Sequence, residues 1–154
     1  MVNKLYYTDK EMKSDLQTIC RDMLVNNYNP DYIIGVTRGG LVPSVLISEF
    51  LDKPLLTISC STRSFQHEVD ISNVINNYEQ DKKYLIVDDI VDSGDTMSII
   101  FNKLEEQFGT SSQFKTACLF YNTAQPNHTP TFYARELNRF EFSDWIVFPF
   151  EKWW

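Results

Sequence analysis

The chain has 154 residues, 43% of them hydrophobic, which is enough for one domain with a full core, and we expect residues 1–154 to form a single domain. Its formal net charge of −7 argues against general binding of nucleic acid, because such binding rests on Lys and Arg contacts with phosphates. No stretch approaches about 18 consecutive apolar residues, and the first residues lack an apolar signal region. We therefore expect a cytoplasmic protein with no membrane partner.

The first part of the chain predicts helices that alternate with strands. Thr8 and Glu11 have the spacing of a capping box, and the apolar stripe that starts at Met12 predicts a helix to about residue 26. Three further elements are predicted after it: a strand at 32–37, a helix at 41–51 and a strand at 54–60. This order indicates a parallel sheet with right-handed crossovers.

The turn between the first predicted strand and the helix that follows it carries Arg38, Gly39 and Gly40. A guanidinium can bind a phosphate through two hydrogen bonds, and glycines let backbone amides come close to an anion. Two interpretations remain open from these residues alone. The turn is either an anion site or a tight turn that carries a surface charge.

Residues 61–82 are the least regular segment. The segment is polar, rich in Asn and long for a compact domain, and these properties indicate a mobile lid that covers a functional site. Arg63 is its nearest candidate cation, and Ser64 is a candidate hydroxyl beside it. A disordered connection without a function is the alternative.

The most informative stretch is YLIVDDIVDSGDT, residues 84–96. Tyr84–Val87 predicts a buried parallel strand, because the run is short, continuous and apolar or aromatic. Residues 96–108 predict a helix with a single apolar stripe. The loop between them lies at the carboxyl end of a strand, where open α/β sheets bind ligands.

This loop offers carboxylates at one end and hydroxyls with a glycine at the other. Asp88 and Asp89 can accept hydrogen bonds from the vicinal hydroxyls of a sugar, or hold Mg²⁺. The amides at the start of the helix can bind a phosphate together with the Ser93 and Thr96 hydroxyls. Gly94 allows the backbone to approach that ligand closely.

In this arrangement Asp92 faces whatever is attached to the sugar. A Walker loop is excluded, because Asp95 stands where that motif needs a Lys before Thr96. An aspartyl-phosphate phosphatase needs two aspartates separated by one residue, whereas Asp88 and Asp89 are adjacent. An acidic, solvated turn with an ordinary helix cap is the structural alternative. Three crowded aspartates repel one another unless a cation lies among them, which favours a binding site.

The last part of the chain predicts one more strand at 114–121, followed by an aromatic-rich segment at 122–154. We expect that segment to form a small C-terminal hood. Taken together, the elements predict an α/β fold with a parallel central sheet flanked by helices.

Residues 84–96 resemble the signature of the type I phosphoribosyltransferases, which is an apolar strand, two acidic residues, two apolar residues and Asp-Thr/Ser-Gly-x-Thr. Every position is matched, with Ser93 in the Thr/Ser position. The Arg38-Gly39-Gly40 turn is similar to the pyrophosphate turn of the purine-type members. WIVFPFE, residues 145–151, is similar to the purine-covering segment of the bacterial xanthine–guanine phosphoribosyltransferases.

The resemblance implies binding of phosphoribosyl pyrophosphate and a purine base in a homodimer or homotetramer. It implies that Asp88 and Asp89 contact the ribose hydroxyls and Mg²⁺, and that Asp92 is the catalytic residue that accepts a proton from the base. The resemblance also implies that the 5-phosphate is surrounded by Asp92, Ser93, Gly94, Asp95 and Thr96, and that pyrophosphate is bound by Arg38, Gly39 and Gly40. It implies that the base is contacted by Asn122, Trp145 and Ile146. The mobile loop that closes over the pyrophosphate would carry Arg63 and Ser64.

The implied reaction is displacement of pyrophosphate by a base, which gives a nucleoside 5-monophosphate in purine salvage. Purine-type members carry a Lys after the strand at 114–121, whereas this chain has Asn122. An Asn can donate to a carbonyl or accept from an amino group, so a 6-oxopurine (xanthine, guanine or hypoxanthine) is expected while the choice of base stays open. Two alternatives are a non-catalytic sensor of phosphoribosyl pyrophosphate or a nucleotide, and a phosphatase.

Overall fold

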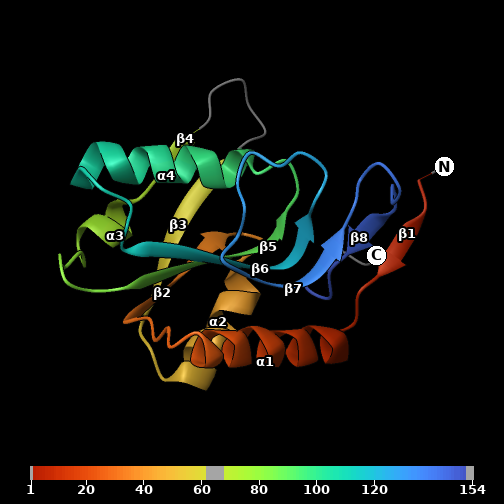
Figure 1. Cartoon of the computed structure of the whole chain (residues 1–154), viewed down its shortest axis with the longest axis horizontal. Helices are drawn as coiled ribbons and strands as arrows, with labels where there is room; N and C mark the ends of the chain where they lie inside the picture. Colours follow the sequence, from red (N-terminus) through yellow and green to blue (C-terminus); the bar gives the residue numbers. More distant parts are fainter. Residues whose placement is uncertain (1, 62–67, 152–154) are drawn as a thin grey trace.

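The computed structural model describes residues 2–61 and 68–151. Helices and strands alternate along most of this part of the chain (Figure 1). In chain order the elements are β1 (Lys4–Tyr6), α1 (Asp9–Val25), β2 (Tyr32–Thr37), α2 (Leu41–Leu51), β3 (Leu55–Ser61), β4 (Glu68–Asp70), α3 (Ser72–Ile75), β5 (Tyr84–Val91), α4 (Asp95–Phe108), β6 (Phe114–Asn122), β7 (Phe132–Leu137) and β8 (Trp145–Val147).

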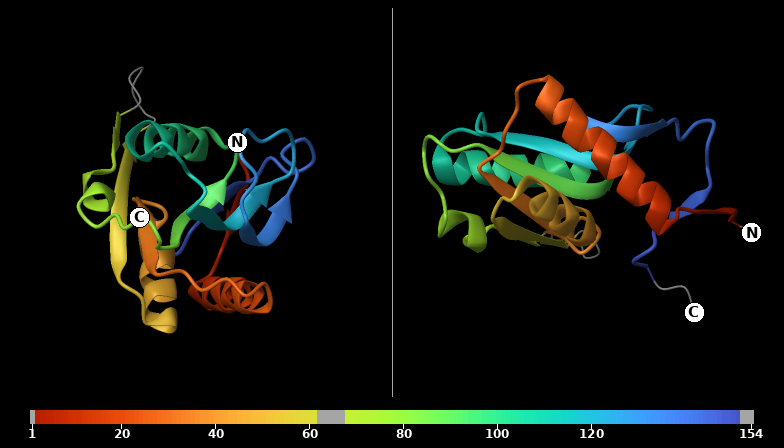
Figure 2. Two further views of the ribbon diagram at one scale, coloured as in Figure 1. Left: turned by 60° about the vertical axis from the view of Figure 1, so that its left-hand side comes forward. Right: turned by 90° about the horizontal axis from the view of Figure 1, so that it is seen from below.

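The central sheet has six strands in the order β4-β3-β2-β5-β6-β7. Neighbouring strands are parallel except for β3 and β4, which pair in an antiparallel manner. Helices α1 and α2 cover one face of this sheet and α4 covers the other (Figures 1 and 2). The prediction of an α/β fold with a mostly parallel sheet between helices is therefore confirmed.

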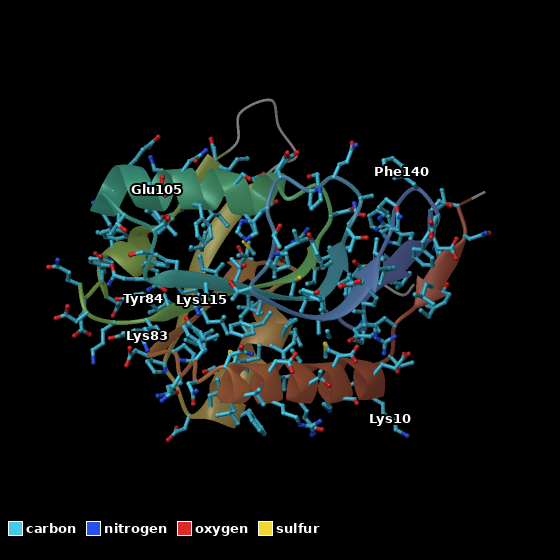
Figure 3. The ribbon with its side chains drawn as sticks, viewed as in Figure 1. Lys10, Lys83, Tyr84, Glu105, Lys115 and Phe140 are labelled. Atoms are coloured by element: carbon cyan, nitrogen blue, oxygen red, sulfur yellow. The ribbon has the colours of Figure 1, made fainter. Side chains whose placement is uncertain are left out.

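The central strands are buried on both faces, as expected for parallel strands between two helical layers. In β5, Leu85 and Val87 pack in the cluster under α1 and α2, whereas Ile86 packs in the cluster under α4. This alternation follows from the two-residue period of a strand. Figure 3 shows Tyr84, at the start of β5, among the strands, whereas Lys10 extends away from α1.

The structure corrects the predicted boundary of the hood. Residues 132–137 lie inside the predicted hood segment 122–154, yet they form β7, which pairs with β6 at the edge of the central sheet. The reason is burial, since Phe132 belongs to the core cluster under α1. Strand β8 instead pairs with β1 in a separate two-stranded sheet, so the hood is built from both ends of the chain.

The predicted irregularity of residues 61–82 is wrong for the part that the structure describes. Strand β4 and helix α3 lie between residues 68 and 75. Ile71 and Val74 are buried in the core cluster under α4, which fixes this segment against the sheet. Arg63 and Ser64 lie outside the described residues, so the lid stays a prediction.

None of the helices in the described ranges combines the length and the apolar composition that crossing a lipid bilayer requires.

Candidate active site

The acidic pair lies at the carboxyl end of β5. The strand continues to Val91 rather than ending at Val87, so Asp88 and Asp89 belong to the strand and not to a loop. Asp88 is paired in register with Cys118 of β6, and its side chain is buried. The Asp89 amide donates to the Asp88 carboxylate over 2.9 Å, and the Ile90 amide donates to the Asp89 carboxylate over 2.7 Å.

Burial disfavours the charged form of the Asp88 and Asp89 carboxyl groups. It raises the pKa of Asp88 well above its usual range, and the neighbouring Asp89 charge raises that pKa further. Burial also raises the pKa of Asp89, and the Glu151 charge contributes to the same direction. Negative charges therefore repel one another at this strand end, and a cation there would relieve their repulsion.

Asp88→Asn is expected to stabilise the ligand-free protein at neutral pH by roughly 1–3 kcal/mol, because the amide removes a buried charge. The folded-state pKa of Asp88 is raised, so the folded protein holds that proton more tightly than the unfolded chain. The stability of the wild type should fall relative to the variant as pH rises above the unfolded-state pKa of about 3.9.

Urea unfolding of the wild type and Asp88→Asn from about pH 4 to about pH 8 measures this difference. The matched control is Asp81→Asn, because Asp81 is exposed on the loop before β5. The control should change stability by less than about 0.5 kcal/mol at every pH. A stability difference between Asp88→Asn and the wild type that does not grow with pH would contradict the buried-charge argument.

The Arg38-Gly39-Gly40 turn packs directly against this acidic strand end. A Cβ on Gly40 would overlap the Val87 carbonyl oxygen and lie 2.8 Å from the Asp88 Cα, and a Cβ on Gly39 would lie 2.6 Å from the Asp89 carboxyl carbon. Gly40 therefore has no room for a side chain, whereas a side chain at Gly39 would fit only if the Asp89 carboxylate moved. Arg38 is exposed and forms no ion pair with the residues that the structure describes, so its guanidinium is available to an anion.

The loop before α4 turns through Gly94, whose φ is +83°, a backbone conformation that favours glycine. The loop that follows β6 supports it from behind. The Asn127 amide donates to the Ser93 carbonyl over 2.7 Å, and the Asn127 side chain donates to the Asp95 carboxylate. A Cβ on Gly94 would lie 2.5 Å from the backbone nitrogen of His128, so the two loops are in close contact.

A hollow of about 210 Å³ lies in front of this loop, and residues 88–97 line it. It therefore contains the acidic strand end, the Ser93 and Thr96 hydroxyls and the start of α4. Amides at a helix N-terminus favour a bound anion. The sugar-phosphate residues predicted from the sequence thus lie around one common space.

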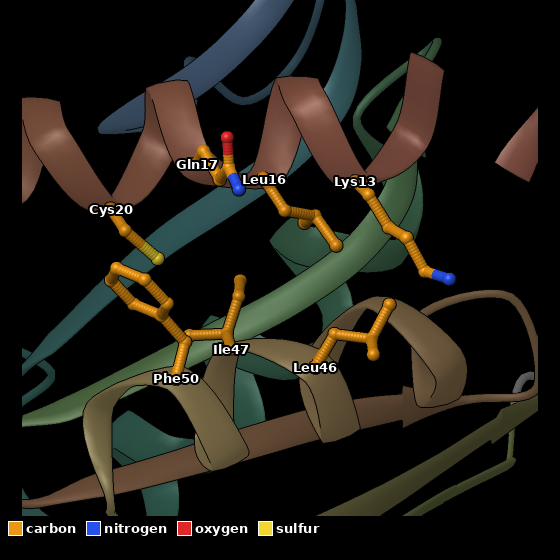
Figure 4. Close-up of a pocket in the computed structure, with 7 residues that line it drawn as sticks. All are labelled: Lys13, Leu16, Gln17, Cys20, Leu46, Ile47 and Phe50. Atoms are coloured by element: carbon orange, nitrogen blue, oxygen red, sulfur yellow. The ribbon is translucent and has the colours of Figure 1, made fainter. Parts of the chain in front are cut away.

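A second hollow of similar size, about 210 Å³, lies between α1 and α2. Figure 4 shows Leu16, Cys20 and Ile47 on its walls with Phe50 at one side. Lys13 is the one charged residue that lines it. This hollow shares no residue with the predicted site, so the chemistry that the sequence predicts belongs to the first hollow.

Asp92 is held by two side chains from the end of the chain. Arg139 Nε lies 3.1 and 3.2 Å from the two carboxylate oxygens, and Arg139 Nη2 lies 3.1 Å from Oδ2. Asn122 Nδ2 donates to Asp92 Oδ1 over 3.1 Å. Sequence reasoning missed Arg139, although it is the one basic residue between Arg135 and Lys152.

The predicted base-contacting residues lie in different environments. Asn122 is buried, and its amide is used within the protein. Ile146 is buried in the core cluster under α1, whereas the Trp145 side chain is 58% exposed. Trp145 pairs in register with Lys4, so β1 holds the strand that carries this exposed aromatic side chain.

A mostly parallel α/β sheet whose strand ends carry an acidic pair, an Arg-Gly-Gly turn and a loop at the start of a helix has the groups that suit a phosphorylated sugar. Residues 4–151 match the model of the phosphoribosyl transferase domain. The chain therefore belongs to the phosphoribosyltransferase family, which confirms the family that the sequence motifs predicted.

Relatives with assigned functions are similar over much of the chain. The chain is 31% identical over 124 residues to a xanthine-guanine phosphoribosyltransferase of Nitratidesulfovibrio vulgaris, and the match covers 78% of this chain and 68% of that protein. It is 28% identical over 123 residues to the protein of that name from Desulfotalea psychrophila, with 77% and 69% covered.

Solved structures agree with this assignment. The crystal structure of a purine phosphoribosyltransferase from Pyrococcus horikoshii superposes with a TM-score of 0.80 at 30% identity, and covers 98% of this chain and 95% of that one. A xanthine-guanine-hypoxanthine phosphoribosyltransferase from Helicobacter pylori gives a TM-score of 0.77 at 20% identity, with 95% and 92% covered. The second likeness supports the fold alone.

Proposed function

We propose that this protein transfers the 5-phosphoribosyl group from phosphoribosyl pyrophosphate to a 6-oxopurine in purine salvage. The observation that carries the proposal is the meeting of three groups at one edge of the sheet. The Arg38 turn touches the acidic pair, and the acidic pair and the loop at 92–96 line one hollow. These groups suit the pyrophosphate, the ribose diol and the 5-phosphate of a single donor.

The names of the relatives support the choice of base. The proteins from Nitratidesulfovibrio vulgaris and Vibrio vulnificus are xanthine-guanine phosphoribosyltransferases, and the latter is 37% identical over 98 residues, which is 60% of each chain. We extend that base class to this chain. Xanthine, guanine and hypoxanthine are the candidates, because each carries an oxygen at carbon 6.

We propose Mg²⁺ as the cofactor, held by Asp88 and Asp89. The donor set fits, since Mg²⁺ prefers carboxylate oxygens and the two groups repel each other without a cation. No group of three His, Cys, Asp or Glu with metal-binding geometry occurs in residues 2–61 and 68–151, so water and substrate would complete the coordination. When bound, the ion would neutralise charge on the pyrophosphate.

Each side chain of the proposed site has a separate role in the reaction. The Arg38 guanidinium and the amides of the glycine turn bind the pyrophosphate, which leaves carbon 1 with the electron pair of its C–O bond. The Asp88 and Asp89 carboxylates position the ribose through its hydroxyls. One nitrogen of the five-membered ring of the purine forms the new C–N bond, and Asp92 accepts the proton that the other nitrogen of that ring loses. Trp145 stacks on the base.

We also propose a cytoplasmic location and a homodimer or homotetramer. The exposed Val45 and Phe50 on α2 support an assembly, because they leave apolar surface that a second copy would cover. Light scattering of the purified protein measures the mass in solution. The mass of a single chain would contradict the proposed assembly and leave the transferase proposal intact.

An assay of pyrophosphate release tests the function. The protein with phosphoribosyl pyrophosphate and Mg²⁺ should release pyrophosphate only when guanine, hypoxanthine or xanthine is added. The control reaction omits the base. Tight binding of phosphoribosyl pyrophosphate without release with any base would favour the sensor instead, and phosphate release from a monoester without a base would favour a phosphatase.

A further inference from the structure

Arg139 connects the Asp92 carboxylate with the hood strand. Its Nε and Nη2 groups contact Asp92, and its Nη1 group donates to the Asp144 carbonyl over 2.9 Å. Asp144 immediately precedes Trp145, the first residue of β8. Arg139 therefore lies between the two protein elements that face the base in the proposed function.

The guanidinium is not saturated by these contacts. It has five N–H bonds, and two of them donate hydrogen bonds among the described residues: Nε–H to Asp92 and one on Nη1 to the Asp144 carbonyl. Nη2 lies at an ion-pair distance from Asp92. The Arg139 side chain is 24% exposed and the Asp92 side chain is 46% exposed. Both partners of this ion pair can therefore still make hydrogen bonds to a ligand.

Asn122 is not available for this purpose. Its Nδ2 group donates to the backbone carbonyl and the carboxylate of Asp92, and its Oδ1 accepts from the amides of Ala124 and Arg139 over 2.9 and 3.1 Å. A buried amide with both ends occupied holds its neighbours in place. Asn122 therefore positions Asp92 and Arg139, and Arg139 is the donor beside Asp92 that remains for a base.

We propose that Asp92 and Arg139 form an acceptor–donor pair that selects bases with an N–H beside a C=O. This inference rests on the proposed function, because it places the base against Asp92. The carboxylate accepts from the base N–H and the guanidinium donates to the adjacent carbonyl oxygen. A purine with an amino group at carbon 6 presents two donors instead, and its amino group would face the Arg139 donors without an acceptor.

Arg139→Gln is expected to lower kcat/KM for guanine and hypoxanthine by roughly 10- to 100-fold, the usual effect of losing a hydrogen bond to a charged donor. Its kcat/KM for adenine and its KM for phosphoribosyl pyrophosphate should change by less than about threefold. Arg139→Lys should recover part of the loss with the oxopurines, because it keeps the charge without the planar fork.

The matched control is Arg135→Gln. Arg135 lies on β7 and pairs with Asp15 and Glu11 of α1, away from Asp92. This control should leave the ratio of guanine to adenine activity unchanged. An equal loss with every base in Arg139→Gln, together with a raised KM for phosphoribosyl pyrophosphate, would show a merely structural role and overturn the inference. Unchanged kinetics would also overturn it.

Binding of guanosine and adenosine 5-monophosphates, measured by calorimetry, separates this inference from the proposed reaction. The wild type should bind the guanine nucleotide more tightly, and Arg139→Gln should lose most of that preference. If the wild type shows this preference without turnover, the transferase proposal fails and the role of Arg139 stands. If the wild type turns over oxopurines and Arg139→Gln keeps the preference, the role of Arg139 fails alone.

Discussion

Asp92→Asn is expected to lower kcat with guanine by on the order of 100-fold or more, while the KM for phosphoribosyl pyrophosphate stays nearly constant. The asparagine amide cannot accept the proton that the base loses. Its oxygen can still accept from Asn122, which donates to Asp92 over 3.1 Å in the wild type. The geometry should therefore survive while the proton acceptor is lost.

Unfolding cannot account for such a loss in Asp92→Asn. The Asp92–Arg139 ion pair is partly exposed, so its removal should cost about 0.2–1 kcal/mol of stability after solvent screening. Thermal unfolding with and without phosphoribosyl pyrophosphate checks this point, and the exposed Asp81→Asn provides the kinetic control. Turnover close to that of the wild type would remove Asp92 from the role of proton acceptor.

Gly40→Ala is expected to destabilise the protein by roughly 3 kcal/mol, because the new methyl group would overlap backbone rather than a movable side chain. That methyl group would meet the Val87 carbonyl and would lie 2.9 Å from the Val36 carbonyl oxygen. Both carbonyls belong to central strands of the sheet, which cannot shift without disturbing their neighbours. Urea unfolding measures the effect.

Gly39→Ala is the matched comparison, because its methyl group would meet the Asp89 side chain. That carboxylate can rotate away, so stability should change by less than about 1 kcal/mol. Displacing a carboxylate that binds the sugar should weaken phosphoribosyl pyrophosphate binding by about tenfold or more. Equal stabilities and equal affinities for Gly39→Ala, Gly40→Ala and the wild type would show that the turn is not confined by β5.

The regular part of the fold could be predicted because its signals are local. The Thr8–Glu11 capping box is present, with the Glu11 amide 3.2 Å from the Thr8 hydroxyl, and α1 begins one residue later than Thr8. The periodicity of apolar residues predicted α2 and α4 to within one residue. Each of these helices buries a face whose apolar residues can be recognised in its own sequence.

The residues of the acidic segment could be predicted from the sequence, but the end of strand β5 could not. Asp88 and Asp89 are polar, so hydrophobic runs predict a strand that ends at Val87. In the structure β6 continues beside them, since Ile90 pairs with Phe120, and the ladder hydrogen bonds carry β5 on to Val91. Strand pairing therefore overrides the local pattern, and it brings Asp88 into a buried position and Asp89 into a half-buried one.

The remaining features depend on contacts between distant residues. Arg139 reaches back 47 positions to Asp92, and nothing in its loop sequence shows a period or a motif. Strand β7 is polar on part of its surface, so its place in the central sheet follows from Phe132 and the edge of β6 rather than from its own pattern. Such partners are fixed by topology, which a single sequence does not display.

The pairing of β1 with β8 has a consequence for the order of assembly. Leu5 and Ile146 are partners across about 140 residues of chain, so this ribbon closes the longest loop in the described structure, and we expect it to form late in folding. All six strands of the central sheet precede Trp145 in the chain, so the sheet that carries Asp88 contains neither strand of this ribbon. We therefore expect the sheet proposed to hold the sugar donor to fold ahead of the ribbon proposed to hold the base.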